Sequence, residues 1–137
     1  MRNAVKLLGT GAPTGKQGRP PEERISPMPL RNLPTEKAAP LAGLIENRPG
    51  QVSSMAFSRG SDASMTLLAF AAGESVSEEK YFGDTLYYVV EGAACVVLPD
   101  VRVRVGAGEV LKVDAHVEHA VEGADGAAFK LLQITLP

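Results

Sequence analysis

The sequence lacks tryptophan and has only three tyrosines and four phenylalanines among its 137 residues. Aromatic residues make up 5% of the chain, too few to build the stacking platforms on which single-stranded nucleic acids bind. The formal net charge is −2 and the pI is near 5.7, so a strongly basic surface for a polyanion is not expected. We therefore expect no nucleic-acid partner.

Cysteine and long apolar segments are also scarce. Cys95 is the only cysteine, which excludes an internal disulfide, and its place in the run GAACVVL predicts a buried, unreactive thiol. The longest apolar run, LLAFAAG with its flanks, is far shorter than the ~20 residues needed to cross a bilayer. Arg2 and Lys6 are not followed by the apolar segment of a signal peptide. A soluble cytoplasmic protein with no membrane partner is the expectation.

Length and composition predict one folded domain after a flexible segment. A chain of 137 residues with 45% apolar residues can bury one substantial core. Residues 1–30 are rich in glycine, proline and charge, and they carry too few large apolar groups to offset the entropy of ordering. We predict a flexible arm over residues 1–30, ordered at most by a partner subunit, and a domain over residues 31–137.

Only one segment has the pattern of a helix. In TEKAAPLAGLIENRPG (35–50), Leu41, Leu44 and Ile45 would share one helical face, and Pro49-Gly50 would end the helix. From residue 51 onwards the apolar period changes to two. In VRVRV (101–105), for example, the valines are predicted to face the opposite side from the arginines.

About eight short runs with this period are separated by turn residues, among them Pro99-Asp100. The runs are QVSSMAFSR, SMTLLAFAAG, DTLYYVVEG, ACVVLPD, VRVRVGAG, EVLKVDA, HAVEG and AFKLLQITL. Short strands with closely spaced turns are typical of an all-β sandwich or barrel.

Both histidines lie in VDAHVEHAVEG (113–123), beside carboxylates, where they are candidate metal ligands. Residues three apart point to opposite faces of a regular strand, so His116 and His119 cannot both face inward. His119 shares the parity of Val117 and Val121, which predicts that it faces the core, while His116 is expected at the rim. A structural histidine that binds nothing is the alternative interpretation.

A second polar cluster lies in GESVSEEKYFGDTLYYVVEG (73–92), with carboxylates at Glu74, Glu78, Glu79 and Asp84 of one strand–turn–strand unit. A solvated acidic loop is one explanation. The other is that one carboxylate lies opposite His119, as ion-pair partner or as metal co-ligand. Two side chains alone bind a metal weakly, because a catalytic site normally offers at least three protein ligands and an open position.

Together the two segments resemble the two motifs of the cupin superfamily. In the first motif, the flanking glycines match, but the family's two-histidine region falls on SEEKY and its glutamate on Thr85. In the second, GEVLKVDAHVEHAVEG (108–123) keeps the family spacing, and His119 matches the metal-binding histidine. GESVSEEKYFGD also follows a pattern of small single-domain cupins, with Glu79 in a histidine position. The resemblance covers roughly residues 33–137.

The resemblance implies an all-β, double-stranded β-helix or jelly-roll barrel, here with one short N-terminal helix. It implies a site in the barrel mouth, whose candidate residues are His119, Glu79, Tyr81, Tyr87 and His116. Of the four ligands expected in the family, only His119 remains by position, and Glu79 is a second candidate. The implied cofactor is therefore either none or a weakly held divalent metal, namely Zn, Mn, Fe or Ni.

Two functions are compatible with this resemblance. The first is a barrel protein that binds a small polar ligand in its mouth, where a Glu79–His119 ion pair would favour imidazolium and form a polar anchor. The second is a metal-dependent enzyme of the dioxygenase, isomerase or lyase type, in which Tyr81 or His116 would act as general acid or base or contact the substrate. The barrel itself does not decide, because one fold hosts many chemistries.

The expected assembly is a homodimer. A short barrel leaves sheet edges with unpaired backbone groups, and the N-terminal arm is long enough to cross to a second subunit.

Overall fold

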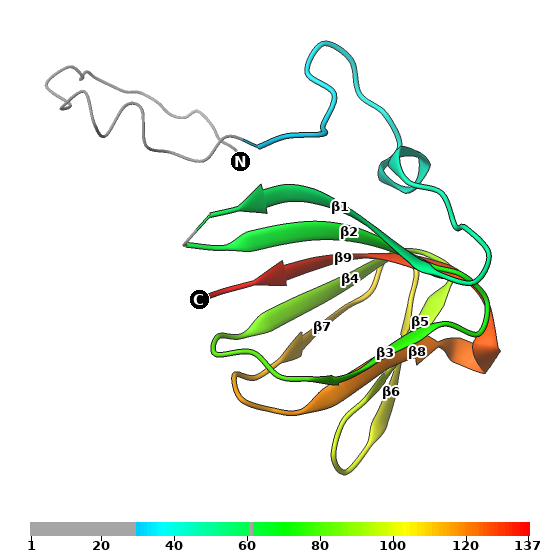
Figure 1. Ribbon diagram of the computed structural model, residues 1–137, viewed down its shortest axis with the longest axis vertical. Helices are drawn as coiled ribbons and strands as arrows, with labels where there is room; N and C mark the ends of the chain where they lie inside the picture. Colours follow the sequence, from blue (N-terminus) through cyan, green and yellow to red (C-terminus); the bar gives the residue numbers. More distant parts are fainter. Residues whose placement is uncertain (1–29, 61) are drawn as a thin grey trace, which may run out of the picture.

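The computed structural model describes residues 30–60 and 62–137, and in this part the chain is built almost entirely from antiparallel strands (Figure 1). The strands are β1 Val52–Arg59, β2 Ser64–Phe70, β3 Ser75–Glu79, β4 Thr85–Glu91, β5 Ala93–Val97, β6 Arg102–Gly106, β7 Val110–Val113, β8 His119–Gly123 and β9 Phe129–Thr135. Two short 3-10 turns, η2 Leu41–Leu44 and η3 Ala124–Gly126, accompany them.

The strands form two sheets that face each other. One sheet has the order β1-β2-β9-β4-β7 and the other has the order β3-β8-β5-β6. Every pairing between described strands is antiparallel, and partners distant in sequence, such as β4 with β9, lie side by side. This is the predicted jelly-roll barrel. All eight predicted runs form strands, and β3 is a ninth, which the sequence indicated only as part of a strand–turn–strand unit.

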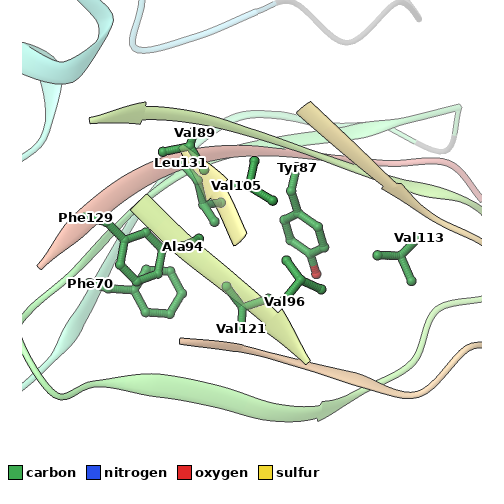
Figure 2. Packing of buried hydrophobic residues seen from close by; sticks show 10 residues of the cluster. All are labelled: Phe70, Tyr87, Val89, Ala94, Val96, Val105, Val113, Val121, Phe129 and Leu131. Carbon is green, nitrogen blue, oxygen red and sulfur yellow. The ribbon is translucent and has the colours of Figure 1, made fainter. Parts of the chain in front are cut away.

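The main core fills the space between the sheets (Figure 2). Period-two alternation places it there: in β4, Thr85, Tyr87 and Val89 are buried while the residues between them are not. Phe70 and Phe129 are direct cross-strand partners, and their rings stack with centroids 4.3 Å apart. Figure 2 shows the Tyr87 side chain projecting into the same space. The apolar groups of two sheets thus define one closed interior.

The predicted helix over residues 35–50 is wrong. Only the four residues of η2 are helical, and Ile45 already has extended backbone angles of φ −140° and ψ 151°. Pro40 and Pro49 leave few residues between them, so the cost of helix nucleation is not repaid by length. The segment instead packs Leu41, Leu44 and Ile45 on the outer face of the five-stranded sheet, against Phe57, Leu67 and Ala69.

Side-chain hydrogen bonds attach this segment to the last residue of β2 and to the first two residues of β9. The Asn47 amide donates to the carbonyl oxygens of Phe70 and Phe129 at 2.8 and 3.2 Å. The Lys130 ammonium donates to the Ala42 carbonyl oxygen at 2.7 Å. The Lys130 bond satisfies a carbonyl oxygen that a helix would have paired internally, and the Asn47 bonds attach the segment to the two strands.

Three smaller predictions have mixed outcomes. Cys95 is partly rather than fully buried, because Ala94 and Val96, on either side of it, face the core. Val103 and Val105 are at least partly buried, whereas Val101 lies at the turn before β6 and is 54% exposed. No helix in the described ranges is long and apolar enough to cross a membrane. The predicted arm, apart from Leu30, lies outside the described residues.

Candidate functional site

The candidate residues gather at one end of the barrel, which we call the barrel mouth. It is formed by the β3–β4 loop (80–84), the β7–β8 turn (114–118) and the last residues of β9, and it lies on the side of the C-terminus in Figure 1. Hydrogen bonds join these parts. The Tyr81 carbonyl oxygen accepts from His116 N–H at 2.8 Å, and the Asp84 carboxylate accepts from Ala115 N–H at 2.9 Å. These hydrogen bonds connect the β3–β4 loop to the β7–β8 turn at the rim of the mouth.

His119 faces the interior, in agreement with the parity argument, and is 4% exposed. Its Nδ1 lies 2.9 Å from the Val117 carbonyl oxygen, which can only accept, so Nδ1 carries a proton. Its Nε2 lies 2.8 Å from the Tyr87 hydroxyl, and in neutral imidazole Nε2 accepts the Tyr87 proton. Both ring nitrogens are therefore engaged within the protein.

Glu79 reaches the same interior because of a β-bulge in β3. Val76 pairs with Val121 and Glu79 with His119, so three steps on β3 oppose two steps on β8. The additional residue places Glu79 on the face of Val76, whereas regular alternation would put it on the opposite face. Glu78, inside the bulge, has a left-handed φ of 58°. The carboxylate and the imidazole thus occupy paired positions on one side of the sheet.

Glu79 bonds to Tyr81 rather than to His119. The Tyr81 hydroxyl donates to Glu79 Oε1 at 2.5 Å and accepts from Gln133 Nε2 at 3.1 Å. Within residues 30–60 and 62–137, no ion pair joins Glu79 to His119, so the predicted ion pair is wrong. The two rings of Tyr81 and His119 are nevertheless neighbours, with centroids 6.1 Å apart.

Both tyrosines are held as neutral phenols. Burial, followed by the hydrogen bond to the Glu79 carboxylate, raises the pKa of Tyr81 to about 12. Burial, with smaller contributions from Tyr81 and Glu79, raises the pKa of Tyr87 well above its ordinary value. Near neutral pH these side chains are therefore hydrogen-bond donors and not anionic ligands.

His116 does not join this network. Its side chain is exposed, its φ is 67°, and its ring meets the exposed ring of Phe82 edge-on at 5.7 Å. Of the other predicted carboxylates, Glu78 is exposed and Asp84 serves the rim as an acceptor. Only Glu79 of the acidic cluster is part of the interior network.

Sequence reasoning missed Gln133 and Thr135 on β9. Gln133 Nε2 also donates to Thr135 Oγ1 at 3.4 Å, and this oxygen accepts a further 3.4 Å hydrogen bond from Thr85. The available signal was parity: both share the face of buried Phe129 and Leu131, so they are polar residues on the core side of an apolar strand. Polar groups there need partners, and the mouth supplies them.

A pocket of about 490 Å³ opens beside this network. Tyr81 and Thr135 belong to both the pocket wall and the network, and Ser64, the cross-strand partner of Thr135, lines it as well. Phe82, Leu136 and Pro137 supply apolar wall. Lys80 also lines it, so the pocket wall combines hydroxyl groups and an ammonium group with apolar surface, as ligand sites commonly combine polar and apolar groups.

The donor set does not fit the divalent metal that the fold family implies. The family's four ligand positions hold one carboxylate, two neutral hydroxyls and one imidazole, namely Glu79, Tyr81, Thr85 and His119. Across the described residues, no three His, Cys, Asp or Glu side chains lie together, and the Tyr87 hydroxyl already occupies His119 Nε2. A catalytic metal site needs at least three protein ligands with free lone pairs.

No protein-family model and no curated protein sequence matches the chain. Among solved structures, a cupin superfamily protein from Desulfitobacterium hafniense is 48% identical with a TM-score of 0.75, over 78% of this chain and 96% of that one. A cupin 2 conserved barrel domain protein from Leptotrichia buccalis is 30% identical with a TM-score of 0.67, over 71% and 46% of the two chains. A conserved Streptococcus pyogenes protein of unknown function shares the fold at 19% identity and a TM-score of 0.74, over 81% and 96%. The chain belongs to the cupin superfamily.

Proposed function

We propose that this cupin holds a small polar molecule in the barrel mouth without a metal centre of its own. The observation that carries the proposal is that hydrogen-bonded side chains stand where the family's metal ligands are expected. Glu79, Tyr81 and Gln133 form one part of it, and Tyr87 with His119 forms the other. A network that is connected in this way presents fixed polar groups to a ligand at little cost in ordering.

Access to solvent supports binding over a purely structural role. Glu79 and Tyr81 are only partly buried, and Tyr81 forms part of the wall of the pocket. The deeper pair, Tyr87 and His119, is buried behind this network and does not line the pocket.

A metal-dependent enzyme is not proposed, because the donor set offers one carboxylate and one occupied imidazole where such an enzyme needs three or more ligands. Elemental analysis of protein purified without a His-tag gives an independent check. We expect substoichiometric metal that added Fe, Mn, Ni, Zn or Co does not restore.

Thermal-shift screening with small amines, carboxylates, polyols and sugars tests the binding function. A ligand present at about one hundred times its Kd stabilises the fold by ~2.7 kcal/mol, which such a screen detects readily. Tyr81→Phe should reduce the stabilisation because it removes the hydroxyl shared by Glu79 and Gln133. Tyr88→Phe, the same change at the partly exposed neighbour of Tyr87, is the matched control. Absence of stabilisation by every class, together with tight stoichiometric metal, would contradict the proposal.

A further inference from the structure

We propose that the ligand of the pocket is a small carboxylate that has an apolar or aromatic group. This inference rests on the proposed binding function and names its ligand class. Three observations support it: the direction of the hydrogen bonds beside the pocket, the charged and polar groups of its wall, and the exposed apolar side chains at its rim.

The hydrogen bonds beside the pocket leave Thr135 as a donor. Tyr81 gives its single proton to the Glu79 carboxylate, so the Gln133 group that faces Tyr81 is its NH₂ group. The same NH₂ group donates to Thr135 Oγ1 at 3.4 Å. Thr85 is 1% exposed, and its hydroxyl also donates to Thr135 Oγ1. Because this oxygen accepts two hydrogen bonds, Thr135 offers the pocket its own hydrogen.

The pocket wall therefore requires an acceptor from the ligand. Glu79 does not line the pocket, but an ionised carboxylate can only accept, and this sets the direction of the bonds through Tyr81 and Gln133. A carboxylate oxygen opposite Thr135 would accept its hydrogen. An ammonium group in the same place would put one donor against another and leave both without a partner.

Ser64 and Arg59 continue the row of polar side chains that begins at Thr135. Ser64 is the cross-strand partner of Thr135, and Arg59 is the cross-strand partner of Ser64. Residues directly opposite each other in antiparallel strands share one face of the sheet. Ser64 lines the pocket, and Arg59 stands on the neighbouring strand β1, at the sheet edge. A second hydroxyl and a guanidinium thus lie in the row of the Thr135 donor.

The charge of the wall favours an anion. Lys80 is the one charged side chain among the described residues that line the pocket. Two of the acidic groups of the mouth are engaged elsewhere: Asp84 accepts from Ala115 N–H, and Asp114 pairs with Lys112. Carboxylates in the mouth still repel an anion over about a Debye length. Recognition therefore depends on direct contact with Lys80.

The apolar part of the ligand is indicated by the rim. Phe82 is 85% exposed and Leu136 is 48% exposed, and both line the pocket. Large apolar side chains that are exposed at a pocket rim gain most from being covered by a ligand. The volume of about 490 Å³ lies within the range of small-molecule sites.

Four probes test the ligand class: phenylacetate, phenylacetamide, phenethylamine and acetate. Phenylacetamide keeps the shape of phenylacetate without its charge, phenethylamine reverses the charge, and acetate lacks the ring. NMR titration of isotope-labelled protein should give a Kd of roughly 1 mM for phenylacetate. The other three probes should bind at least about threefold more weakly. The amide signals of Ser64, Lys80 and Thr135 should shift most with phenylacetate.

Lys80→Met tests the group that recognises the charge. Lys80 is exposed, so the fold should persist, which circular dichroism checks. Phenylacetate should bind about threefold to tenfold more weakly, because a charge-assisted hydrogen bond is lost from a partly screened site. Phenylacetamide should bind as before. Lys37→Met makes the same change in net charge on the segment outside the five-stranded sheet, and should alter the affinity less than about twofold.

Thr135→Val tests the hydroxyl donor, and Thr135→Ser is its matched control. The valine should weaken phenylacetate binding about threefold or more, whereas the serine keeps the hydroxyl and should retain most of the affinity. The valine also leaves Gln133 and Thr85 without an acceptor, so urea unfolding must show that the variant is folded. If it is not, Ser64→Ala tests the neighbouring hydroxyl, and unchanged affinity there contradicts the donor argument.

The outcomes separate this inference from the function on which it rests. Binding of phenylacetamide or phenethylamine as tight as that of phenylacetate overturns the carboxylate class, and so does unchanged phenylacetate affinity in Lys80→Met. Equal affinity for acetate overturns the apolar group. If a different class binds and Tyr81→Phe weakens it, the mouth remains a binding site. Failure of all four probes overturns the carboxylate class, and failure of every class in the wider screen removes the binding function with it.

Discussion

Tyr87→Phe tests whether the interior pair is a structural anchor. Tyr87 is 2% exposed and His119 is 4% exposed, so no solvent reaches the 2.8 Å hydrogen bond between the hydroxyl and Nε2. The substitution removes one oxygen atom and keeps the ring that packs in the core. Nε2 of His119 is then left without its partner.

The expected loss of stability has two contributions. An average intramolecular hydrogen bond contributes ~1 kcal/mol net, and a buried group left unsatisfied costs about 1–3 kcal/mol. Removal of a buried hydroxyl recovers part of this, because the phenol no longer has to be desolvated. We therefore expect a decrease of about 1–3 kcal/mol in the free energy of unfolding.

Urea unfolding followed by circular dichroism measures this difference, with an unchanged m-value as evidence that only stability changed. Tyr88→Phe is the control, because its ring lies on the outer face and is 36% exposed; it should stay within about 0.5 kcal/mol of the wild type. If Tyr87→Phe is as stable as Tyr88→Phe, the hydrogen bond does not anchor His119 and our description of the interior pair is wrong.

Further predictions concern the rim, the tyrosines, the bulge and the assembly. Gly83→Ala should cost about 1–3 kcal/mol in thermal or urea unfolding, because its Cβ would overlap the carbonyl oxygens of the last two residues; no loss would contradict this. The raised pKa values of Tyr81 and Tyr87 mean that the unfolded chain releases these protons first. Stability should therefore fall as the pH rises above about 10, and absorbance at alkaline pH should show late titration that Tyr81→Phe reduces. Deletion of Glu78 should remove the bulge but keep Glu79 on the face of Val76, because the two residues would then be two apart, so the late Tyr81 titration should persist; a shift to lower pH would refute this register. The homodimer stays a prediction, which sedimentation of a monomer at micromolar concentration would contradict.

The strands could be predicted because their burial is local information. Alternation in β4, β5 and β9 records which face of each strand meets the core, and turn residues mark the ends. The helix prediction was wrong because the conformation of that segment depends on contacts with distant residues. Leu41, Leu44 and Ile45 do pack together, but an apolar spacing that suits a helix also suits a short turn followed by extended chain. Tertiary hydrogen bonds from Asn47 and Lys130 favour the latter.

The site was less accessible to sequence reasoning because it depends on pairs of residues from different strands. Parity correctly placed His119 inward, since β8 is regular. It could not identify the partner of its Nε2, because Tyr87 was one of several polar residues with an inward or unknown direction. Gln133 was visible as a polar residue of inward parity, but its role needs Tyr81 to lie beside it.

Glu79 shows most clearly why a local pattern is insufficient. Counted from Val76 by twos, position 79 faces outward, and the acidic cluster then looks like a solvated loop. One additional residue in β3 against β8 reverses that direction and brings the carboxylate to the level of His119. A bulge of this kind is stabilised by the partner strand rather than by its own residues, since Glu78 pays a steric cost for its left-handed backbone. The position of the carboxylate in the mouth is therefore a property of the paired strands.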